Sequence, residues 1–84
     1  MPYITKESRK SLANPDNHPG TPGGLNYLIT RTINTYIEHQ GGVSYYSINE
    51  VIGVLECAKL ELYRRIAAPY EDTKLEENGD VFTV

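Results

Sequence analysis

The feature that most constrains the fold is a pair of adjacent glycines, Gly41 and Gly42, between two stretches in which apolar residues recur with helical spacing. Glycines are suited to end a helix, because they adopt the left-handed backbone that follows its last turn. We therefore expect a helix over residues 25–40 that ends at these glycines. Its buried stripe is predicted to consist of Leu25, Leu28, Ile29, Thr32, Ile33 and Tyr36.

A second helix is predicted to begin at "SINE", in which Ser47 caps the helix and Glu50 reaches back in a capping box. It should end at about Ala68, because Pro69 disfavours helical geometry at the residue before it. The fold expected is mainly α, a two-helix antiparallel hairpin. The core face of the second helix is predicted to carry Ile48, Val51, Ile52, Leu55, Leu62 and Ile66.

The opposite side of the second helix carries Gly53, Val54, Cys57 and Leu60, where a monomer would normally be charged. A chain of 84 residues buries little surface and is usually stabilised by disulfides, a metal or self-association. With a single cysteine, no internal disulfide can form, and His18 and His39 are too far apart in sequence to suggest a zinc site. These four residues are therefore the predicted interface of a homo-oligomer.

The two ends of the chain flank the hairpin within one domain, residues 1–84. Thr5 could cap a brief helix over residues 6–12, and Ser8 is an equally plausible cap. Residues 14–24, rich in proline and glycine, are predicted to be a mobile loop. Residues 70–84 are predicted to be an acidic tail ending in a strand, Val81 to Val84, that could pair with residues 3–5 or with another subunit.

Net charge limits the partners that the chain can bind. With 8 basic and 11 acidic residues, the formal charge is −3, which argues against a nucleic acid polymer as ligand. No apolar run is long enough to span a membrane, and no signal-peptide pattern is present. We expect a cytoplasmic protein without a membrane partner.

The candidate binding residues gather before and after Pro69. Arg64 and Arg65 follow Tyr63, and Tyr70 comes next after the proline. The planar guanidinium suits phosphate, and tyrosine rings stack on bases. The alternative interpretation is structural, since cations favour a helix C-terminus and Arg65 can pair with a glutamate four residues earlier.

Three further residues complete the predicted ligand-binding set. Lys59 projects into the core stripe, so it must reach solvent, pair with Glu56 or face a ligand. Tyr3 and Tyr27 lack an obvious core role, and amphipathic rings are common in interfaces and binding pockets.

A search for catalytic patterns finds none. The glycine-rich "PGTPGG" contains no lysine and follows no strand, so it is not a phosphate-binding loop of the usual sort. Cys57 has apolar neighbours and no nearby base, which favours inert packing over a nucleophile. We expect neither an enzyme nor a cofactor or metal.

Several short segments of the sequence are similar to those of a family of short, functionally unassigned proteins of phage and bacterial genomes. They are "MPYIT", "LNYLIT", "VLECAK" and the run "YRRIAAPYEDTKLEENGDV". The resemblance implies a phage-associated setting, and host-cell cytoplasm, but transfers no catalytic residue. By architecture alone, the chain is also similar to small phage proteins that sequester nucleotide immune signals.

Two functions are consistent with these residues. The first is a non-catalytic oligomer that captures a phosphate-bearing small molecule, such as a cyclic nucleotide used as an immune signal, in an anti-defense role. The second is a protein-interaction module, for instance a phage inhibitor of a host protein, that uses its tyrosine-rich and acidic surfaces. The cation–aromatic cluster favours the first, and the negative charge favours the second.

Overall fold

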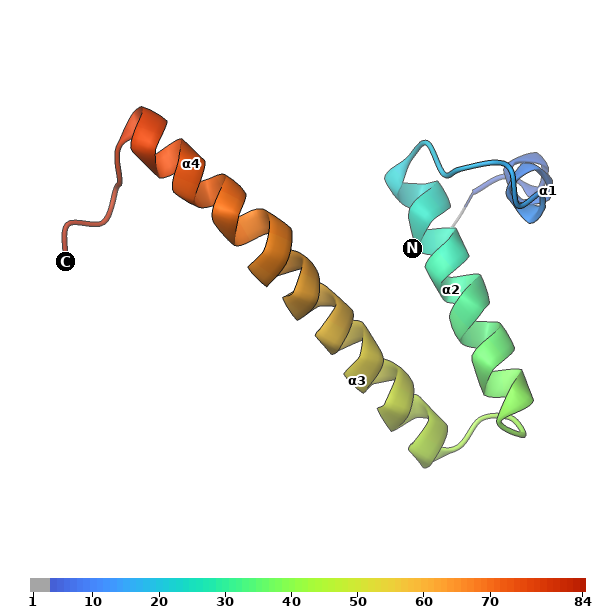
Figure 1. The fold of residues 1–84 in the computed structure, drawn as a ribbon. Coiled ribbons are helices and arrows are strands. Elements are labelled where there is room, and N and C mark those ends of the chain that lie inside the picture. Colours follow the sequence, from blue (N-terminus) through green and yellow to red (C-terminus); the bar gives the residue numbers. More distant parts are fainter. Residues whose placement is uncertain (1–3) are drawn as a thin grey trace. The chain divides into compact units, whose positions relative to one another are not determined.

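The computed structural model describes residues 4–84, which are mainly helical (Figure 1). The elements are α1 (Lys6–Ala13), α2 (Pro22–His39), α3 (Tyr45–Leu62), the π-helical segment η1 (Tyr63–Ala67) and α4 (Ala68–Asn78). The chain divides into two compact units, Met1–Ile48 and Asn49–Val84. Each unit is described by itself below.

The N-terminal unit is held together where α1 packs on the start of α2. Thr5 caps α1, as predicted, since its hydroxyl accepts a hydrogen bond from the Ser8 N–H at 3.1 Å. Leu12 is the one large apolar side chain that is buried among the described residues, with 8% of its surface exposed. Its partner is Gly24, at which an added Cβ would lie 3.5 Å from the Leu12 Cδ1 atom. That distance is an ordinary van der Waals contact, so Leu12 packs directly against the backbone of α2 at Gly24.

The segment predicted as a loop over residues 14–24 is shorter in the structure. Thr21 caps α2 by accepting a hydrogen bond from the Gly24 N–H at 3.0 Å, and Pro22 occupies the first turn. Proline fits there because the first N–H groups of a helix have no intrahelical partner. The remaining loop is tied to α1, since the Asn17 side chain donates to the Ser11 carbonyl at 2.7 Å. Reading "PGG" as loop was wrong because these residues stand at a helix start.

The end of α2 follows the prediction from the paired glycines. Gly41 and Gly42 both have positive φ, +92° and +105°. The Gly42 N–H donates to the Ile37 carbonyl at 3.0 Å and the Gly41 N–H donates to the Glu38 carbonyl at 3.2 Å. This pair of bonds satisfies carbonyls that the helix would otherwise leave without partners.

The start of α3 differs from the predicted capping box. Ser44, not Ser47, accepts the capping bond, from the Ser47 N–H at 3.0 Å. The Ser47 hydroxyl in turn accepts from the Ser44 N–H at 3.1 Å, and Ser47 is 2% exposed. The reciprocal pattern of a capping box is present, but it begins three residues earlier and uses a serine where glutamate was expected.

Pro69 does not end the helix, contrary to the prediction. In the C-terminal unit, α3, η1 and α4 follow one another without a loop as far as Asn78 (Figure 1). A proline inside an α-helix removes one hydrogen bond and clashes with the carbonyl four residues before it. The wider π turn resolves this conflict: the Ala68 N–H bonds to the Tyr63 carbonyl, five residues back, and Pro69 lies in the first turn of α4.

The fold is therefore three helices, with α3, η1 and α4 forming the third, rather than a two-helix hairpin. Residues 79–84 contain no strand, and neither does any other part of the described range, so the predicted terminal strand is wrong. The Asn78-Gly79 pair ends α4 instead, through a bond from the Gly79 N–H to the Leu75 carbonyl at 2.8 Å. The proposed strand partner, residues 3–5, lies partly outside the described residues.

The expected core face of the second helix is not buried within the C-terminal unit taken by itself. Between Asn49 and Val84, all of which the structure describes, no residue is buried. Ile52 is 60% exposed, and Leu62 and Ile66 are each 62% exposed. Taken by itself, the C-terminal unit therefore leaves these apolar side chains exposed.

Candidate functional site

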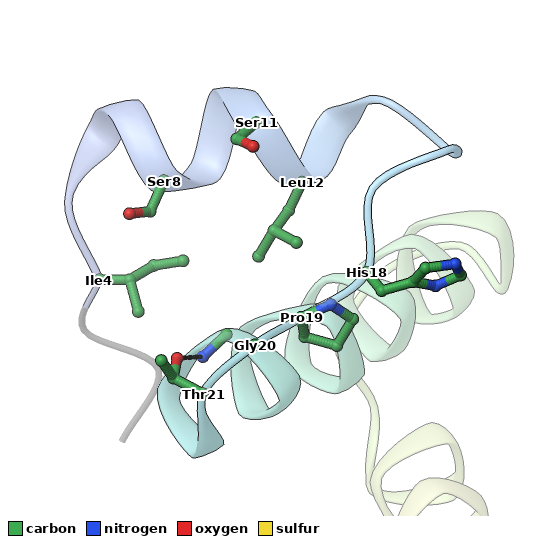
Figure 2. A pocket seen from close by; sticks show the side chains of 9 residues that line it. Ile4, Ser8, Ser11, Leu12, His18, Pro19, Gly20 and Thr21 are labelled. Atoms are coloured by element: carbon green, nitrogen blue, oxygen red, sulfur yellow. Dashed lines mark hydrogen bonds between the residues drawn. The ribbon is translucent and has the colours of Figure 1, made fainter.

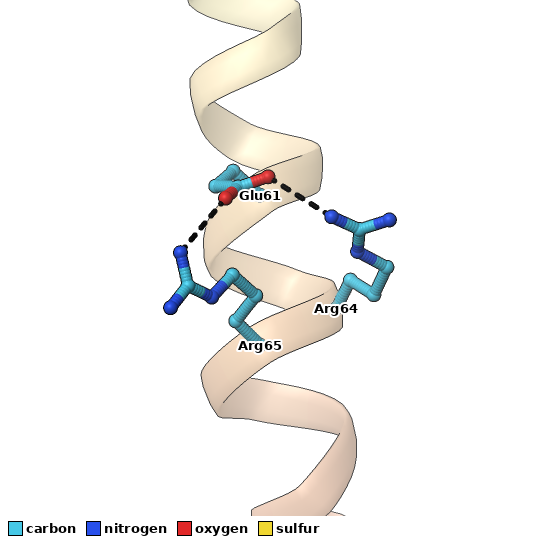
Figure 3. A network of polar contacts seen from close by, with 3 residues as sticks. All are labelled: Glu61, Arg64 and Arg65. Atoms are coloured by element: carbon cyan, nitrogen blue, oxygen red, sulfur yellow. Dashed lines mark hydrogen bonds and ion pairs between the residues drawn. The ribbon is translucent and has the colours of Figure 1, made fainter.

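The two arginines of the predicted site converge on one carboxylate. Glu61 lies between them, with an Arg64 Nη2–Oε2 distance of 3.3 Å and an Arg65 Nη1–Oε1 distance of 3.1 Å (Figure 3). The predicted pairing of Arg65 with the glutamate four residues earlier is confirmed. Arg64 joins because residues three apart also meet on a helix surface. The cluster carries one net positive charge.

This cluster is open to solvent. The Arg64 side chain is 78% exposed, the Arg65 side chain 69% and the Glu61 side chain 53%. Exposed ion pairs contribute little to stability, since water screens the charges and ordering two long side chains costs entropy. Both guanidinium groups can therefore leave Glu61 for a ligand at small cost.

A shallow groove lies on each side of Glu61. One is lined by Ala58, Glu61, Leu62, Arg65 and Ile66. The other is lined by Cys57, Leu60, Glu61, Tyr63 and Arg64. Each groove thus combines an apolar floor with one arginine and a shared carboxylate.

Lys59 and Tyr70, from the predicted set, contact neighbours on their own helix. Lys59 pairs with Glu56 at 3.6 Å, which confirms the partner expected from their spacing. The ring of Tyr70 lies under the Lys74 ammonium group, 5.5 Å from the ring centroid. Tyr63 and Tyr70 are 54% and 62% exposed. The lysine four residues after Tyr70 was a signal that the sequence prediction did not use.

Tyr27 belongs to a different place in the fold. Its ring lies beside the guanidinium groups of Arg9 and Arg31, each with its central carbon 5.7 Å from the ring centroid. Arg31 also donates to the Leu12 carbonyl at 3.5 Å, so this group helps to hold α1 on α2. The contacts of Tyr27 thus lie within the N-terminal unit, its role in binding stays a prediction, and Tyr3 lies outside the described residues.

The structure leaves the predicted oligomer interface open. An added Cβ at Gly53 would meet nothing within 4 Å, and Val54 and Leu60 are 67% and 55% exposed. Cys57 is also exposed in the single chain, so its packing in that interface stays a prediction. The apolar neighbours of Cys57 are themselves exposed, which the helical pattern alone did not reveal. That this face joins subunits stays a prediction.

A second pocket lies in the N-terminal unit, between α1 and the loop before α2. Figure 2 shows Ile4, Ser8 and Leu12 turned toward the segment from His18 to Thr21. Its hydroxyl groups have local partners: Ser8 accepts from the Thr5 hydroxyl at 2.9 Å, and Ser11 accepts from the Asn17 amide at 3.2 Å. These bonds stabilise the helix end and the loop, so the pocket is a packing feature.

Two other kinds of site were searched for in residues 4–84. No group of three or more His, Cys, Asp or Glu side chains in this range could hold a metal ion. None of the helices described there is long and apolar enough to cross a membrane.

Comparison with known proteins gives one result. Residues 1–81 match the family described as a domain of unknown function, DUF6899. No curated protein and no solved structure matches the chain. The match extends over nearly all of the sequence, including both units and the segment around Pro69. The chain therefore belongs to the DUF6899 family of domains of unknown function.

Proposed function

We propose that this protein is a non-catalytic interaction module that binds a basic surface of another protein through α4 and the exposed tyrosines beside it. The observation that carries this proposal is the charge of α4. The element contains four acidic residues and one lysine, a net charge of −3, and all of its side chains from Pro69 onward are exposed. Only Lys74 offsets them, and it pairs with Glu77 at 3.2 Å.

Tyrosines border this acidic surface. Tyr70 lies in the first turn of α4, and Tyr63 lies one segment earlier in η1. Aromatic residues are enriched in protein interfaces, because they bury a large area and still offer a hydroxyl group. Acidic groups around such rings steer a basic partner toward them and disfavour acidic ones. In the phage setting implied by the resemblance, the partner would be a host protein.

Photo-crosslinking tests this function. A benzoylphenylalanine at position 70 is expected to capture one partner with a basic surface in cells that express the protein. The matched control places the same group at Asn34, which is exposed on α2. Capture at position 70 should disappear when the acidic residues of α4 are replaced by their amides, in the changes Glu71→Gln, Asp72→Asn, Glu76→Gln and Glu77→Gln.

Two results would refute the proposal. One is capture of the same proteins from position 34 as from position 70, which would indicate non-specific contact. The other is an adduct at position 70 that survives removal of the four charges. Circular dichroism of the amide variant shows whether its helix content is retained.

The capture of a phosphate-bearing small molecule, such as a nucleotide immune signal, is a second candidate. The specific observation in its favour is that Arg64 and Arg65 share a single carboxylate and lie beside Tyr63. A phosphate could replace Glu61 as the partner of both guanidinium groups, while a base stacks on the tyrosine ring. The two grooves beside Glu61 would supply the apolar contact.

Native mass spectrometry with a panel of mono-, di- and cyclic nucleotides would find such a ligand. Arg64→Ala and Arg65→Ala should then each weaken its binding, by tenfold or more if a charged hydrogen bond of about 1.5–3 kcal/mol is lost. Lys74→Ala is the matched control, because its ammonium group lies on the Tyr70 ring and not at Glu61. Unchanged affinity in both arginine variants would exclude this site.

A further inference from the structure

We propose that the N-terminal unit binds a small phosphate monoester through the guanidinium groups of Arg9 and Arg31. The two groups share one aromatic ring, because the central carbon of each lies 5.7 Å from the centroid of Tyr27. Arg9 belongs to α1, whereas Tyr27 and Arg31 lie about one turn apart on α2. The packing of α1 on α2 therefore builds this cluster, called the two-arginine site below.

The two arginines differ from the cations of the C-terminal unit in having no carboxylate partner. The structure describes all eight lysines and arginines of the chain. Each of the four in the C-terminal unit pairs with a glutamate at 3.6 Å or less. The four in the N-terminal unit form no ion pair with any residue in the range 4–84, and these are Lys6, Arg9, Lys10 and Arg31. An external anion therefore meets no internal competitor at the two-arginine site.

The carboxylates of the N-terminal unit lie where they do not neutralise the site. Glu7 precedes Arg9 by two residues, and side chains at this spacing do not face each other on a helix. Glu38 accepts a hydrogen bond from the Asn34 amide at 3.2 Å. The third, Asp16, lies in the loop after α1.

The charge around the site favours anions. Lys6 lies three residues before Arg9 and Lys10 follows it directly, so α1 brings two further positive charges to this region. Residues 1–48 contain four basic and three acidic residues, a net charge of +1, whereas residues 49–84 contain four basic and eight acidic residues, a net charge of −4. This asymmetry draws a small anion to the N-terminal unit, while the net charge of the whole chain disfavours a nucleic acid polymer.

The donors of the site match a phosphate group. A guanidinium group presents a planar fork of N–H donors, and the three free oxygens of a phosphate monoester can accept from two such forks. The Arg31 guanidinium group directs one donor at the Leu12 carbonyl, at 3.5 Å, and keeps the other four for a ligand. Both arginines are exposed, and the half-buried ring of Tyr27 supports them. A carboxylate, with two oxygens, fills only one fork.

Carbon-13 NMR of the arginine Cζ atoms tests the proposal in the unaltered full chain. The probe is glycerol phosphate at about pH 7.5 and constant ionic strength, where a phosphate monoester is mostly a dianion. The Cζ signals of Arg9 and Arg31 should shift and saturate with a Kd of about 1 mM, while those of Arg64 and Arg65 should not. No saturation below about 20 mM would overturn the proposal. So would equal shifts of all four arginines, which would indicate general screening of charge.

Charge-removing variants and a second anion make the test specific. Arg9→Gln and Arg31→Gln should each weaken binding by about tenfold or more, and the matched control Lys74→Gln, which removes the same charge from the other unit, by less than about twofold. Arg9→Lys keeps the charge and loses the fork, so it should still weaken binding by about threefold or more. Acetate should bind about tenfold more weakly than glycerol phosphate.

Two outcomes of these comparisons would overturn the proposal. Unchanged affinity in Arg9→Lys, or equal affinity for acetate, would show that charge alone attracts the anion. Equal effects of Arg31→Gln and Lys74→Gln would place the ligand elsewhere. Circular dichroism confirms that each variant retains its helices, and the shift pattern of the wild type needs no variant at all. The site lies apart from α4 and from Glu61, so its failure leaves the proposed function untouched.

Discussion

Replacement of Leu12 by alanine tests whether one contact holds α1 on α2. Leu12 is 8% exposed and is the sole large apolar side chain buried in the described chain. A buried Leu→Ala change costs about 2–5 kcal/mol. The lower end applies here, because Leu12 keeps 8% of its surface exposed and its neighbour Pro19 is only partly buried, so the surrounding groups can close partly over the space.

A loss of about 2 kcal/mol corresponds to a roughly 30-fold increase in the open population of α1. Amide hydrogen exchange reports this directly, because local unfolding exposes the N–H groups of that helix first. Exchange in α1 should accelerate by that factor in Leu12→Ala. The control Leu25→Ala removes the same atoms from a side chain that is 52% exposed, and should accelerate it less than about threefold.

The reasoning would be refuted by unchanged α1 exchange in Leu12→Ala. It would also be refuted by equal effects in the two leucine variants, since the difference in burial would then have no energetic consequence. The measurement uses the full chain, so it does not require the N-terminal unit to fold alone.

Two further predictions concern the C-terminal helix. Gly53→Ala should stabilise it by about 1 kcal/mol, read as a higher melting temperature, because the new methyl group meets no atom of the chain within 4 Å. A lower melting temperature would contradict this and favour the oligomer interface predicted at Gly53. Pro69→Ala should restore the regular α-helical hydrogen bonds across η1. NMR should then show the Ala68 N–H hydrogen-bonded to the carbonyl four residues back. If the π turn persists, the proline does not cause it.

Local signals in the sequence predicted the parts of the fold that depend on local chemistry. Thr5 and the paired glycines Gly41 and Gly42 define helix ends through their own hydrogen bonds and backbone angles. The pairs Glu56–Lys59 and Glu61–Arg65 follow from the spacing of residues on a helix surface. None of these features depends on which other helix packs against the residues concerned.

The failures occur where two local rules compete. Pro69 should stop a helix, but a single wide turn costs less than ending a helix whose neighbours on both sides have good propensity. Ser44 and Ser47 can both cap a helix. Because the helix begins next to Ser44, each serine hydroxyl accepts a hydrogen bond from the backbone N–H of the other serine. The sequence pattern contains both options and does not rank them.

Burial could not be predicted from periodicity. The apolar stripe of the second helix was assigned to a core within one chain, but periodicity shows only that residues share a face and not what covers that face. Cys57 is exposed in the single chain for the same reason, and its packing against another copy stays a prediction. For the candidate site, residue spacing predicted the pairing of Arg65 with Glu61 but not that Arg64 shares the same carboxylate.

Photo-crosslinking from the acidic helix tests the proposed function most directly. With benzoylphenylalanine at position 70, we expect one adduct with a protein that has a basic surface, because the four carboxylates of α4 attract it. The adduct should be lost when Glu71→Gln, Asp72→Asn, Glu76→Gln and Glu77→Gln remove these charges together. An adduct that survives their removal would contradict the proposed function.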